Sequence, residues 1–485
     1  MPSSPGRTAQ VMADIRRRAA SRQLGPGDRL PSIRGLARSL GASPSTVAEA
    51  YDRLAAEGLI RARPGSGFFL AATALPLSLA AVAPQPEREI DPLWMSRQAL
   101  DGGDAVLKPG CGWLPADWMP DAAIRRALRT LSRADLSILT DYGSPLGAPP
   151  LRKVLARQMS MAGLPVAADQ LLLTGSGTHA IDLICRFMLR PGDTVLVDDP
   201  CYFNFRALLL AHQARVVGVP FTPEGPDPDA FAHAAARHEP RLYITNSAIH
   251  NPTGATLSAR IAHRVLNAAA VADTVIVEDD IFADLEPEPS ARLAVLDGLT
   301  RVIRIGSFSK TLSASVRCGF IAARPDWIAA LTDLQVATQF GGPSPMAAAM
   351  VAEMLIDGSY RRHLDMLHRR LNRKRREAAA SLAELGIQPW LTPRAGLFLW
   401  CRLPDNRNAT VLAERAFREN VVLAPGDVFS AGRTARNFMR FNVAQMGDAR
   451  LMPMLRRLLG EVPPYGPPQQ PGRDAAGMTA TGASS

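Results

Sequence analysis

The first 70 residues have the apolar spacing of a short helical module. Val11, Ile15 and Ala19 recur at intervals of four residues, which predicts a first helix. Ser32 is a suitable N-cap for a second helix, which Gly41 is suited to end. The inner positions of this second helix are apolar, as a helix that packs on a small core requires.

A third helix is predicted directly after this turn. Ser43 can cap its N-terminus, and Pro44 takes the first helical position, where a missing N–H group costs nothing. Val47, Tyr51 and Leu54 then fall on one face, which we expect to be buried. Two helices joined by a tight, glycine-containing turn are typical of the helix-turn-helix, whose second helix enters the major groove of DNA by its N-terminal end.

A β-hairpin is predicted after the third helix. Residues 59–63 alternate in polarity, a Pro-Gly-Ser-Gly turn follows, and residues 68–70 are apolar. Such a hairpin would be the wing of a winged helix-turn-helix, with its arginines beside phosphates. Residues 1–70 hold eleven arginines and five acids, so +6 of the net charge of +10 lies here. A basic module fits nucleic acid, and the alternatives are a merely solvated basic surface or a small helical packing module.

Residues 92–462 alternate short apolar runs with helical patterns. Nearly continuous apolar strands separated by helices are typical of an α/β domain with a mostly parallel sheet, whose ligands bind at the carboxyl ends of strands. The flanking residues 71–91 are rich in Ala and Pro and are expected to be a linker, and residues 463–485 are expected to be a disordered tail. The predicted strands are 171–173, 194–198, 215–219, 242–245, 274–278, 301–306 and 319–322.

Bulk properties argue against membrane, secreted and metal-binding classes. No apolar run reaches the ~18–20 residues that span a membrane, and no apolar stretch follows the basic N-terminal residues as in a secretory signal. We therefore expect a cytoplasmic protein without a membrane partner. The five cysteines are scattered singly, without metal-ligand spacing, so we expect reduced, buried thiols and no metal site.

The strand ends of this domain hold residues suited to an aldehyde and an anion. Lys310 follows a predicted strand, and a buried lysine is costly unless it is neutralised, as in a Schiff base. Residues 174–179 form a glycine-rich strand-to-helix turn, which presents N–H groups and a helix dipole to a phosphate. We expect His179 to support this turn rather than to react. The expected phosphate ligands are Ser176, Gly177, Thr178, Ser307, Ser309 and Arg317.

Three acids follow one another at the end of another predicted strand. Asp279 is the candidate partner of a ring nitrogen, and Glu278 and Asp280 are alternatives that strand alternation puts on the opposite side. Asn251 can donate to a ring oxygen, and Tyr202 can stack on a ring, although a lone aromatic residue is more often part of a core. An amine, phosphate ligands, a carboxylate, a polar partner for a 3-hydroxyl and a flat surface are what pyridoxal 5'-phosphate requires.

The N-terminal module resembles the GntR-type winged helix-turn-helix over residues 26–69. The resemblance implies double-stranded DNA as a partner. This chain has Pro44 and Ala48 where related members carry arginines in the recognition helix, so base readout depends on fewer charged groups. The DNA contacts that the resemblance implies are Arg34, Ser43, Ser45, Thr46, Arg61, Arg63, Gly65 and Ser66.

The larger domain resembles the fold-type-I aminotransferases, because the motifs GSGTH, DPCY, HNPTG, EDDIF, SFSKT and VRCGF occur in family order. The resemblance implies a mostly parallel sheet with a smaller C-terminal α+β domain. It also implies that Lys310 forms the Schiff base with pyridoxal 5'-phosphate, Asp279 contacts the ring nitrogen and Arg317 binds the phosphate. Arg440 is similar to the arginine that receives a substrate carboxylate. Tyr142 resembles the tyrosine that reaches the partner subunit's phosphate, which implies a homodimer.

One position departs from the aminotransferase pattern. Phe282 stands where the family usually has a tyrosine, three residues after the aspartate. The hydroxyl that bonds the 3-oxygen of the cofactor is therefore missing. Asn251 remains, so we expect the cofactor to bind, whereas the missing hydroxyl argues against efficient transamination.

The two parts together resemble the MocR-type transcription regulators. Our hypothesis is that an amine or amino acid displaces Lys310 to form an external aldimine, with its carboxylate held by Arg440. This would shift an equilibrium between two arrangements of the protein. One alternative is an active aminotransferase that carries a DNA-binding head. Another is a DNA-binding protein whose cofactor-free larger domain serves only for dimerisation.

Overall fold

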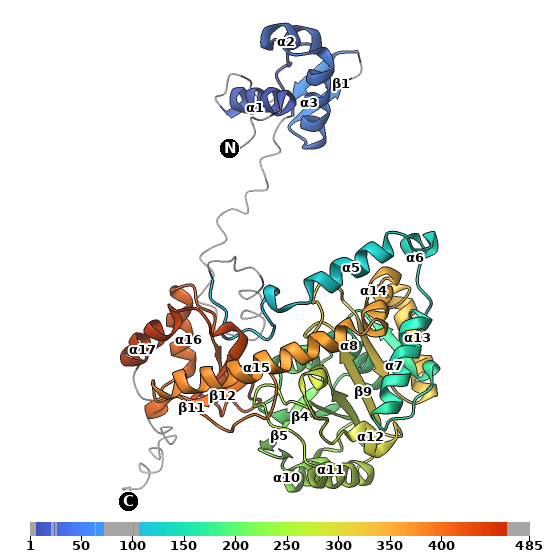
Figure 1. Ribbon diagram of the computed structural model, residues 1–485, viewed down its shortest axis with the longest axis vertical. Helices are drawn as coiled ribbons and strands as arrows, with labels where there is room; N and C mark the ends of the chain where they lie inside the picture. The colour runs from blue at the N-terminus through green and yellow to red at the C-terminus, as the bar shows by residue number, and fades with distance from the viewer. Residues whose placement is uncertain are drawn as a thin grey trace, which may run out of the picture. The chain divides into compact units, whose positions relative to one another are not determined.

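The computed structural model describes residues 6–20, 24, 27–63, 65–71, 100 and 106–462. The chain divides into two compact units, which we call the head (Met1–Arg88) and the body (Glu89–Ser485). Figure 1 shows the elements of each unit. The expected linker, apart from Ala71, and the expected tail lie outside the described residues, so both stay predictions.

The head consists of three helices and a two-stranded antiparallel hairpin, which confirms the winged helix-turn-helix expected from the sequence. The Ser43 hydroxyl accepts a hydrogen bond from the Thr46 amide at 3.1 Å and so caps α3, and Gly41 ends α2 with a left-handed φ of 60°. Tyr51 is fully buried, and its hydroxyl donates to the Pro31 carbonyl at 2.8 Å. The elements are α1 (Arg7–Ala20), α2 (Ile33–Leu40), α3 (Pro44–Ala56), β1 (Ile60–Arg63) and β2 (Gly67–Leu70).

The body is built on an eight-stranded sheet in the order β3-β10-β9-β8-β7-β4-β5-β6. Its central strands β5, β4, β7, β8 and β9 pair in parallel, whereas β10 is antiparallel to both of its neighbours. The fold class expected from the alternating pattern is therefore confirmed. The strands are β3 (Leu171–Thr174), β4 (Thr194–Asp199), β5 (Arg215–Thr222), β6 (Gly225–Pro226), β7 (Leu242–Thr245), β8 (Val275–Asp279), β9 (Val302–Ser307) and β10 (Gly319–Ala322).

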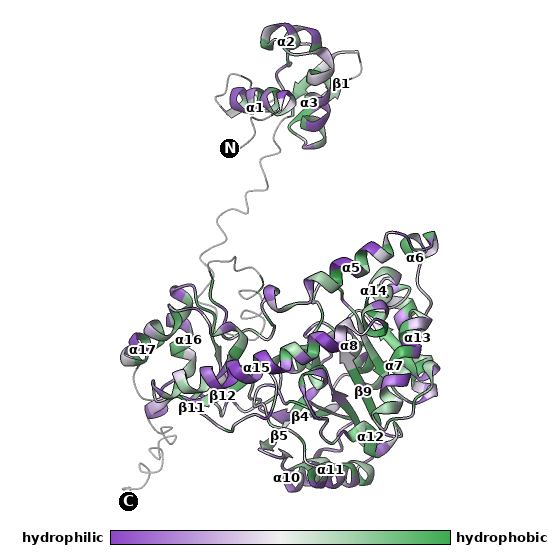
Figure 2. Cartoon of the chain, in the orientation of Figure 1, coloured by the Kyte–Doolittle hydropathy of each residue, from purple (hydrophilic) through white to green (hydrophobic). Residues whose placement is uncertain are grey.

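Side-chain alternation along these strands creates a core on each face of the sheet. Leu196 and Ile276 pack with helices of one layer, whereas their neighbours Val195 and Val275 pack with helices of the other. Hydrophobic residues accordingly dominate central strands such as β9 in Figure 2. One layer contains α7 (Pro149–Met161), α10 (Pro228–His238), α11 (Ala259–Val271) and α14 (Pro345–Ile356), and the other contains α8 (Gly177–Met188), α9 (Phe203–Ala211) and α13 (Pro325–Gln339).

The expected smaller α+β part follows the large sheet. Its antiparallel sheet has the order β11-β12-β14-β13, and three helices pack against it around buried leucines. Its elements are α15 (Ser359–Ala383), β11 (Gln388–Pro389), β12 (Phe398–Arg402), α16 (Ala409–Arg418), β13 (Ala424–Pro425), β14 (Phe438–Asn442) and α17 (Leu451–Glu461). The other α-helices in the part of the body that the structure describes are α5 (Asp121–Leu131), α6 (Leu136–Thr140) and α12 (Leu293–Asp297).

The described residues include neither a membrane-spanning helix nor a cluster of metal-binding side chains. None of their helices combines the length and the apolar character needed to cross a membrane. They contain no group of three or more His, Cys, Asp or Glu side chains placed to hold a metal ion. All five cysteines are buried and free.

Candidate functional site

Three acids of the head, Asp14, Glu49 and Glu57, neutralise arginines of α1 and α3. Arg34, Arg61 and Arg63 are exposed and take part in none of the ion pairs formed by the described head residues. These three arginines can therefore bind phosphates without first breaking an ion pair. The ion pairs among the described residues of the head are Arg16–Glu57, Arg17–Asp14, Arg18–Asp14 and Arg53–Glu49.

The N-terminus of α3 presents a cluster of exposed hydroxyls. The Ser43 Oγ lies 2.8 Å from the Ser45 Oγ and 2.7 Å from the Thr46 Oγ1. All three hydroxyls lie at the positive end of the helix dipole, which favours an anion or a base edge. The structure therefore brings together the predicted contacts of the recognition helix.

The wing adds a basic residue that the sequence analysis missed. Gly65 has a φ of 73°, which suits the tight turn, and the Ser66 amide donates to the Arg63 carbonyl at 2.9 Å. Arg29 pairs with Phe69 of β2 through an isolated bridge, so this exposed arginine lies at the hairpin edge. Its only signal in the sequence was its charge, because the pairing joins residues forty positions apart.

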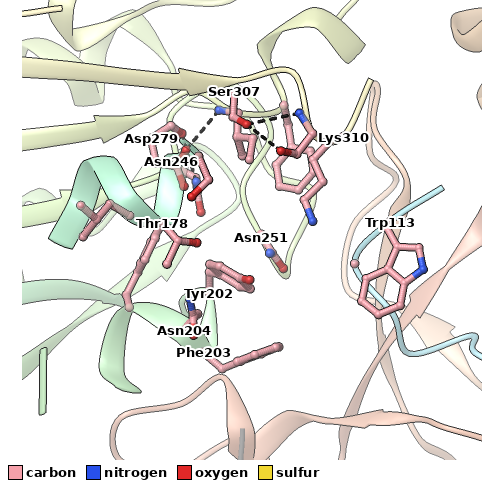
Figure 3. Close-up of a pocket in the computed structure, with 18 of the residues that line it drawn as sticks. Trp113, Thr178, Tyr202, Phe203, Asn204, Asn246, Asn251, Asp279, Ser307 and Lys310 are labelled. Atoms are coloured by element: carbon pink, nitrogen blue, oxygen red, sulfur yellow. Dashed lines mark hydrogen bonds between the residues drawn. The ribbon is translucent and has the colours of Figure 1, made fainter. Parts of the chain in front are cut away.

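Strand ends of the large sheet surround a cavity of about 580 Å³ in the body. Figure 3 shows the side chains of this cavity. Parallel strands bring their carboxyl ends to one edge, which is why residues far apart in the sequence meet here. The predicted residues that line the cavity are Ser176, Gly177, Thr178, Tyr202, Asn251, Asp279, Ser307, Ser309, Lys310, Arg317 and Arg440.

Lys310 lies in the turn after β9, and its side chain extends into the cavity in Figure 3. Burial lowers the pKa of Lys310 to about 8, and the Arg440 cation acts in the same direction, whereas Asp279 opposes it. A lysine with this pKa is partly neutral near physiological pH. Its amine can therefore attack an aldehyde carbon.

Of the three consecutive acids, only Asp279 lines the cavity. Glu278 points away and accepts hydrogen bonds from the amides of residues 293 and 294 at 2.7 and 2.9 Å, and Asp280 pairs with Arg304 at 2.6 Å. Burial raises the pKa of Asp279 to about 7. A carboxyl with this pKa can share a proton with a basic ring nitrogen.

The start of α8, the end of β9 and the turn that follows β9 form another part of the cavity wall. The Ser176 hydroxyl caps α8, so the free amides of its first turn face the cavity. The Ser307 and Ser309 hydroxyls lie 3.0 Å apart, and Arg317 has a left-handed φ of 49°, which is uncommon for a side chain of this size. His179 does not line the cavity, because its Nδ1 accepts a hydrogen bond from the residue 175 amide at 3.2 Å.

Arg440 on β14 supplies a buried cation to the other side of the cavity. Its side chain is 1% exposed, and burial lowers its pKa to about 10. It donates to the Asn251 Oδ1 at 2.7 Å and to the Gly110 carbonyl at 2.6 Å, between the rings of Phe398 and Phe429. None of the ion pairs among described residues involves Arg440, so an anionic ligand is the natural partner of its charge.

Sequence analysis missed several residues of the cavity, notably Asn246, Trp113 and Asn204. The Asn246 side chain donates to the Asp279 carbonyl at 3.0 Å. Its position directly after β7 was a usable signal, because polar residues at strand ends face the ligand in this fold. Trp113 lies across the cavity from Thr178 in Figure 3 and precedes the large sheet by many residues, so no local pattern placed it there.

Comparison with known families covers both units. The gntR family of bacterial regulatory proteins matches residues 7–70, and the aminotransferase class I and II family matches residues 115–458. The chain belongs to the aminotransferase class I and II family. Its head carries the gntR-family domain, so this aminotransferase-family chain has the architecture of a regulator.

Individual relatives of this aminotransferase-family chain include both regulators and enzymes. The HTH-type transcriptional regulator YdcR of Escherichia coli (strain K12) is 30% identical, over 90% of this chain and 95% of its own length. The 2-aminoadipate transaminase of Thermus thermophilus is 28% identical, over 72% of this chain and 88% of its own length. The crystal structure of LysN, an α-aminoadipate aminotransferase from Thermus thermophilus complexed with N-(5'-phosphopyridoxyl)-L-leucine, covers 76% of this chain and 94% of that chain, at 27% identity and a TM-score of 0.69.

The residues of this aminotransferase-family cavity fit pyridoxal 5'-phosphate. Lys310 offers an amine of lowered pKa, and Asp279 offers a buried carboxyl. A side chain at position 319 would approach the backbone of residues 176 and 177 within 2.9–3.1 Å, so glycine there keeps the phosphate wall compact. Gly177 itself has only the Ile281 and Ser307 side chains near its missing Cβ, at 3.7 and 3.8 Å.

Phe282 and Tyr142 add no polar group to the cavity of their own chain. Phe282 is buried in the cavity wall with its ring 5.5 Å from that of Phe398, so no hydroxyl is present where the family pattern has a tyrosine. Tyr142 is 83% exposed, packs on the ring of Phe340 at 5.6 Å and does not line the cavity of its own chain. The role of Tyr142 in a partner's site stays a prediction.

Proposed function

We propose that the protein is a DNA-binding transcription regulator that binds pyridoxal 5'-phosphate and senses an amine or amino acid. The observation that carries this proposal is a full cofactor set, including Lys310, Asp279 and Arg317, on the same chain as a gntR-family head. A MocR-type regulator would have this combination. Such a protein works where the DNA is, in the cytoplasm.

The cofactor, when bound, supplies an aldehyde that condenses with primary amines and a ring that withdraws electrons when its nitrogen is protonated. In this proposal Lys310 would hold the cofactor through its Nζ when no effector is present. Asp279 keeps a proton at the ring nitrogen. Ser176, Gly177 and Arg317 bind the phosphate, together with Thr178, Ser307 and Ser309. Tyr202 covers the ring, and Asn251 donates to the ring oxygen.

Arg440 makes amino acids better effectors than simple amines. Its guanidinium binds the effector carboxylate. This carboxylate supplies a negatively charged partner for the buried Arg440 cation, which forms no ion pair among the described residues. A bound effector amine would compete with the Lys310 Nζ for the same aldehyde carbon, so that Lys310 would be either attached to the cofactor or released as a free amine. Regulation follows if the released and attached forms of Lys310 favour different arrangements of the protein.

Phe282 favours regulation over catalysis. A complete transamination needs finely tuned protonation of the cofactor, and a phenylalanine at this wall cannot donate to the 3-oxygen. The second candidate function, an active aminotransferase with a DNA-binding head, is favoured by the remaining groups of the cavity and by the likeness to the 2-aminoadipate transaminase. Sustained production of a keto acid would distinguish that function.

The proposed regulator is a homodimer. Exposed apolar residues on α5, α6 and α14, among them Leu128, Leu139 and Met346, line a second hollow of about 770 Å³. Arg317 lines both this hollow and the cofactor cavity. A partner subunit that covers the hollow would therefore lie next to Arg317. In such a dimer, Tyr142 of one protomer could contact the phosphate that the other protomer binds.

A visible absorption titration tests the proposal. Purified protein that holds the cofactor on Lys310 absorbs in the visible region, and an effector amine changes that band. We expect an amino acid to shift the band to a new position, at which the band then stays. We expect the same amino acid to change the affinity of the protein for DNA. Lys310→Ala should abolish the band shift and the DNA response together. A Lys310→Ala variant that still responds on DNA would falsify the proposal, and a band that bleaches and returns with a keto acid would instead support the aminotransferase.

A further inference from the structure

Helix α15 carries a row of arginines along its solvent-facing side. Arg362, Arg369, Arg373 and Arg376 are all exposed, and we call these four residues the α15 stripe. Their spacing is made of steps of three, four and seven residues, which keeps them on one side of a helix. The opposite side is buried through residues such as Leu371. Figure 2 shows strongly hydrophilic residues along much of this helix.

The charge of the α15 stripe is poorly neutralised. The helix has eight arginine or lysine residues and only two acids. Among the described residues, Arg369 and Arg376 take part in no ion pair. Arg362 donates only to a backbone carbonyl, at 3.5 Å, and Arg373 approaches Glu377 at 3.6 Å. Like charges one turn apart destabilise an isolated helix, so an anionic partner would relieve a cost built into α15.

Several other exposed arginines of the body are held by carboxylates, whereas others, such as Arg129, Arg157 and Arg237, form no ion pair among the described residues. Pairs with N···O distances of 2.5–2.9 Å occur on α11, before α13 and before α17, whereas the stripe has no pair this close. Asp365 and Glu377 are also exposed on this helix, but its arginine and lysine residues outnumber them eight to two, and a surface with this excess of positive charge can bind a polyanion. The paired arginines are Arg260 (to Glu224), Arg264 (to Asp229), Arg324 (to Asp326) and Arg450 (to Asp448).

We propose that the α15 stripe is a second DNA-binding surface, which binds phosphates of the same duplex that the head binds. From Arg362 to Arg376 the helix rises about 21 Å at 1.5 Å per residue, and this length matches on the order of six phosphates at 3.4 Å per strand step. Because head and body are on one chain, DNA bound by the head is held at high local concentration near the body. The inference rests on DNA binding by the head and assigns a direct contact to the body.

The stripe contributes affinity and salt dependence rather than sequence preference. Arginine contacts to phosphates release counterions, so each lost contact lowers the salt slope of binding by about 0.9. Phosphates carry no sequence information, so the choice of operator stays with the head. A change in the arrangement of the body on effector binding would then alter the total DNA affinity even if the head kept its own contacts.

The test compares full-length wild type with a variant in which Arg362, Arg369, Arg373 and Arg376 are all changed to Gln. Fluorescence anisotropy measures binding to mixed-sequence duplexes of about 20 and about 60 base pairs at several salt concentrations, since a gntR-type dimer spans roughly one to two turns of DNA. On the long duplex we expect affinity to fall at least about tenfold and the salt slope to fall by up to ~3.6 for four contacts. On the short duplex, which the head occupies, the two proteins should bind within about twofold.

A matched control removes four other arginines. Arg260, Arg264, Arg324 and Arg450 changed to Gln lower the net charge equally, and this variant should keep wild-type affinity on the long duplex. The visible cofactor band and the unfolding temperature verify that both variants are folded. Equal affinity and slope for the stripe variant and wild type would overturn the inference, as would an equal loss in the control variant. Wild type that binds neither duplex would instead refute DNA binding by the head.

Discussion

The guanidinium of Arg440 donates a hydrogen bond of 2.7 Å to the side-chain oxygen of Asn251. Arg440 belongs to β14 of the smaller sheet, and Asn251 follows β7 of the large sheet, so this bond links the two parts of the body. In the proposed function, Arg440 binds the effector carboxylate and Asn251 contacts the cofactor. An effector that binds Arg440 therefore acts on both sheets through one contact.

Arg440→Lys should weaken the binding of amino acids but not the binding of simple amines. Lysine keeps the charge but cannot donate two parallel hydrogen bonds or stack between Phe398 and Phe429. We expect the dissociation constants of amino acid effectors, measured by the shift of the visible band, to rise by roughly 10- to 100-fold, as for a lost charged hydrogen bond. Alkyl amines without a carboxylate serve as the control and should change little. An equal loss for both classes would contradict the role of Arg440 as carboxylate receptor.

Asp279→Asn should change the pH dependence of stability in the cofactor-free protein. Burial raises the pKa of Asp279 to about 7, so between about pH 4 and 7 the folded state holds a proton that the unfolded state has lost. The contribution of Asp279 to stability therefore falls as pH rises through this window. Asparagine does not titrate, so the variant should be more stable than wild type near pH 8, by up to roughly 4 kcal/mol.

Urea unfolding of both cofactor-free proteins across this pH range is the measurement for Asp279→Asn. The difference in unfolding free energy should shrink toward about pH 4, where the wild-type Asp279 carboxyl is protonated in the folded state and about half protonated in the unfolded state. A difference that stays constant with pH would show that Asp279 does not titrate in this window. With cofactor present, the variant should bind pyridoxal 5'-phosphate more weakly, because the proton at the ring nitrogen loses its partner.

Phe282→Tyr should move the body toward aminotransferase chemistry. A hydroxyl at this wall could donate to the 3-oxygen of the cofactor, which would lower the pH at which the visible band changes form. We expect keto acid production to rise by about 10-fold or more, within the range for one positioned proton donor. Spectral pH titration and a keto acid assay check both effects. Phe282→Leu is the control, since it changes the packing against Phe398 without adding a hydroxyl.

Arg61→Gln should weaken DNA binding by the head. Arg61 is exposed on β1 and takes part in none of the ion pairs of the described residues, so it can bind a phosphate. We expect a several-fold loss of affinity and a decrease of about 0.9 in the salt slope. Arg53→Gln is the matched control, because Arg53 is paired with Glu49 at 2.5 Å. Equal effects of the two substitutions would argue against the wing contact.

Phe340→Ser should weaken the proposed homodimer. Phe340 is 69% exposed and packs on Tyr142, beside the hollow that a partner would cover. Loss of a large aromatic contact at an interface costs about 2 kcal/mol or more, which is roughly a 30-fold weaker dimer. Sedimentation velocity over a range of concentrations measures this change. Leu296→Ser is the control, since Leu296 is 53% exposed but lies on α12, away from the hollow.

Much of the fold could be predicted because its signals are local. The cap formed by Ser43, the apolar spacing of α3 and the runs of β-branched residues depend on neighbours within one or two turns. The boundaries shifted slightly: β8 extends to Asp279, and α8 begins at Gly177, because the Ser176 hydroxyl caps it earlier than the apolar pattern suggested. The cofactor motifs were recognisable for the same reason, since each occupies a few consecutive residues.

The sequence alone predicted a DNA-binding module joined to an α/β domain, the elements of the head, seven of the eight strands of the large sheet and the motif residues that line the cavity. Only the tertiary structure decided that Asp279 faces the cavity while Asp280 pairs with Arg304. It also brought Asn246 and Trp113 to the cavity and joined Arg440 to Asn251 across 189 positions of sequence. Periodicity and capping act between near neighbours, whereas the sharing of a buried cavity depends on how strands and sheets pack, which no local pattern records.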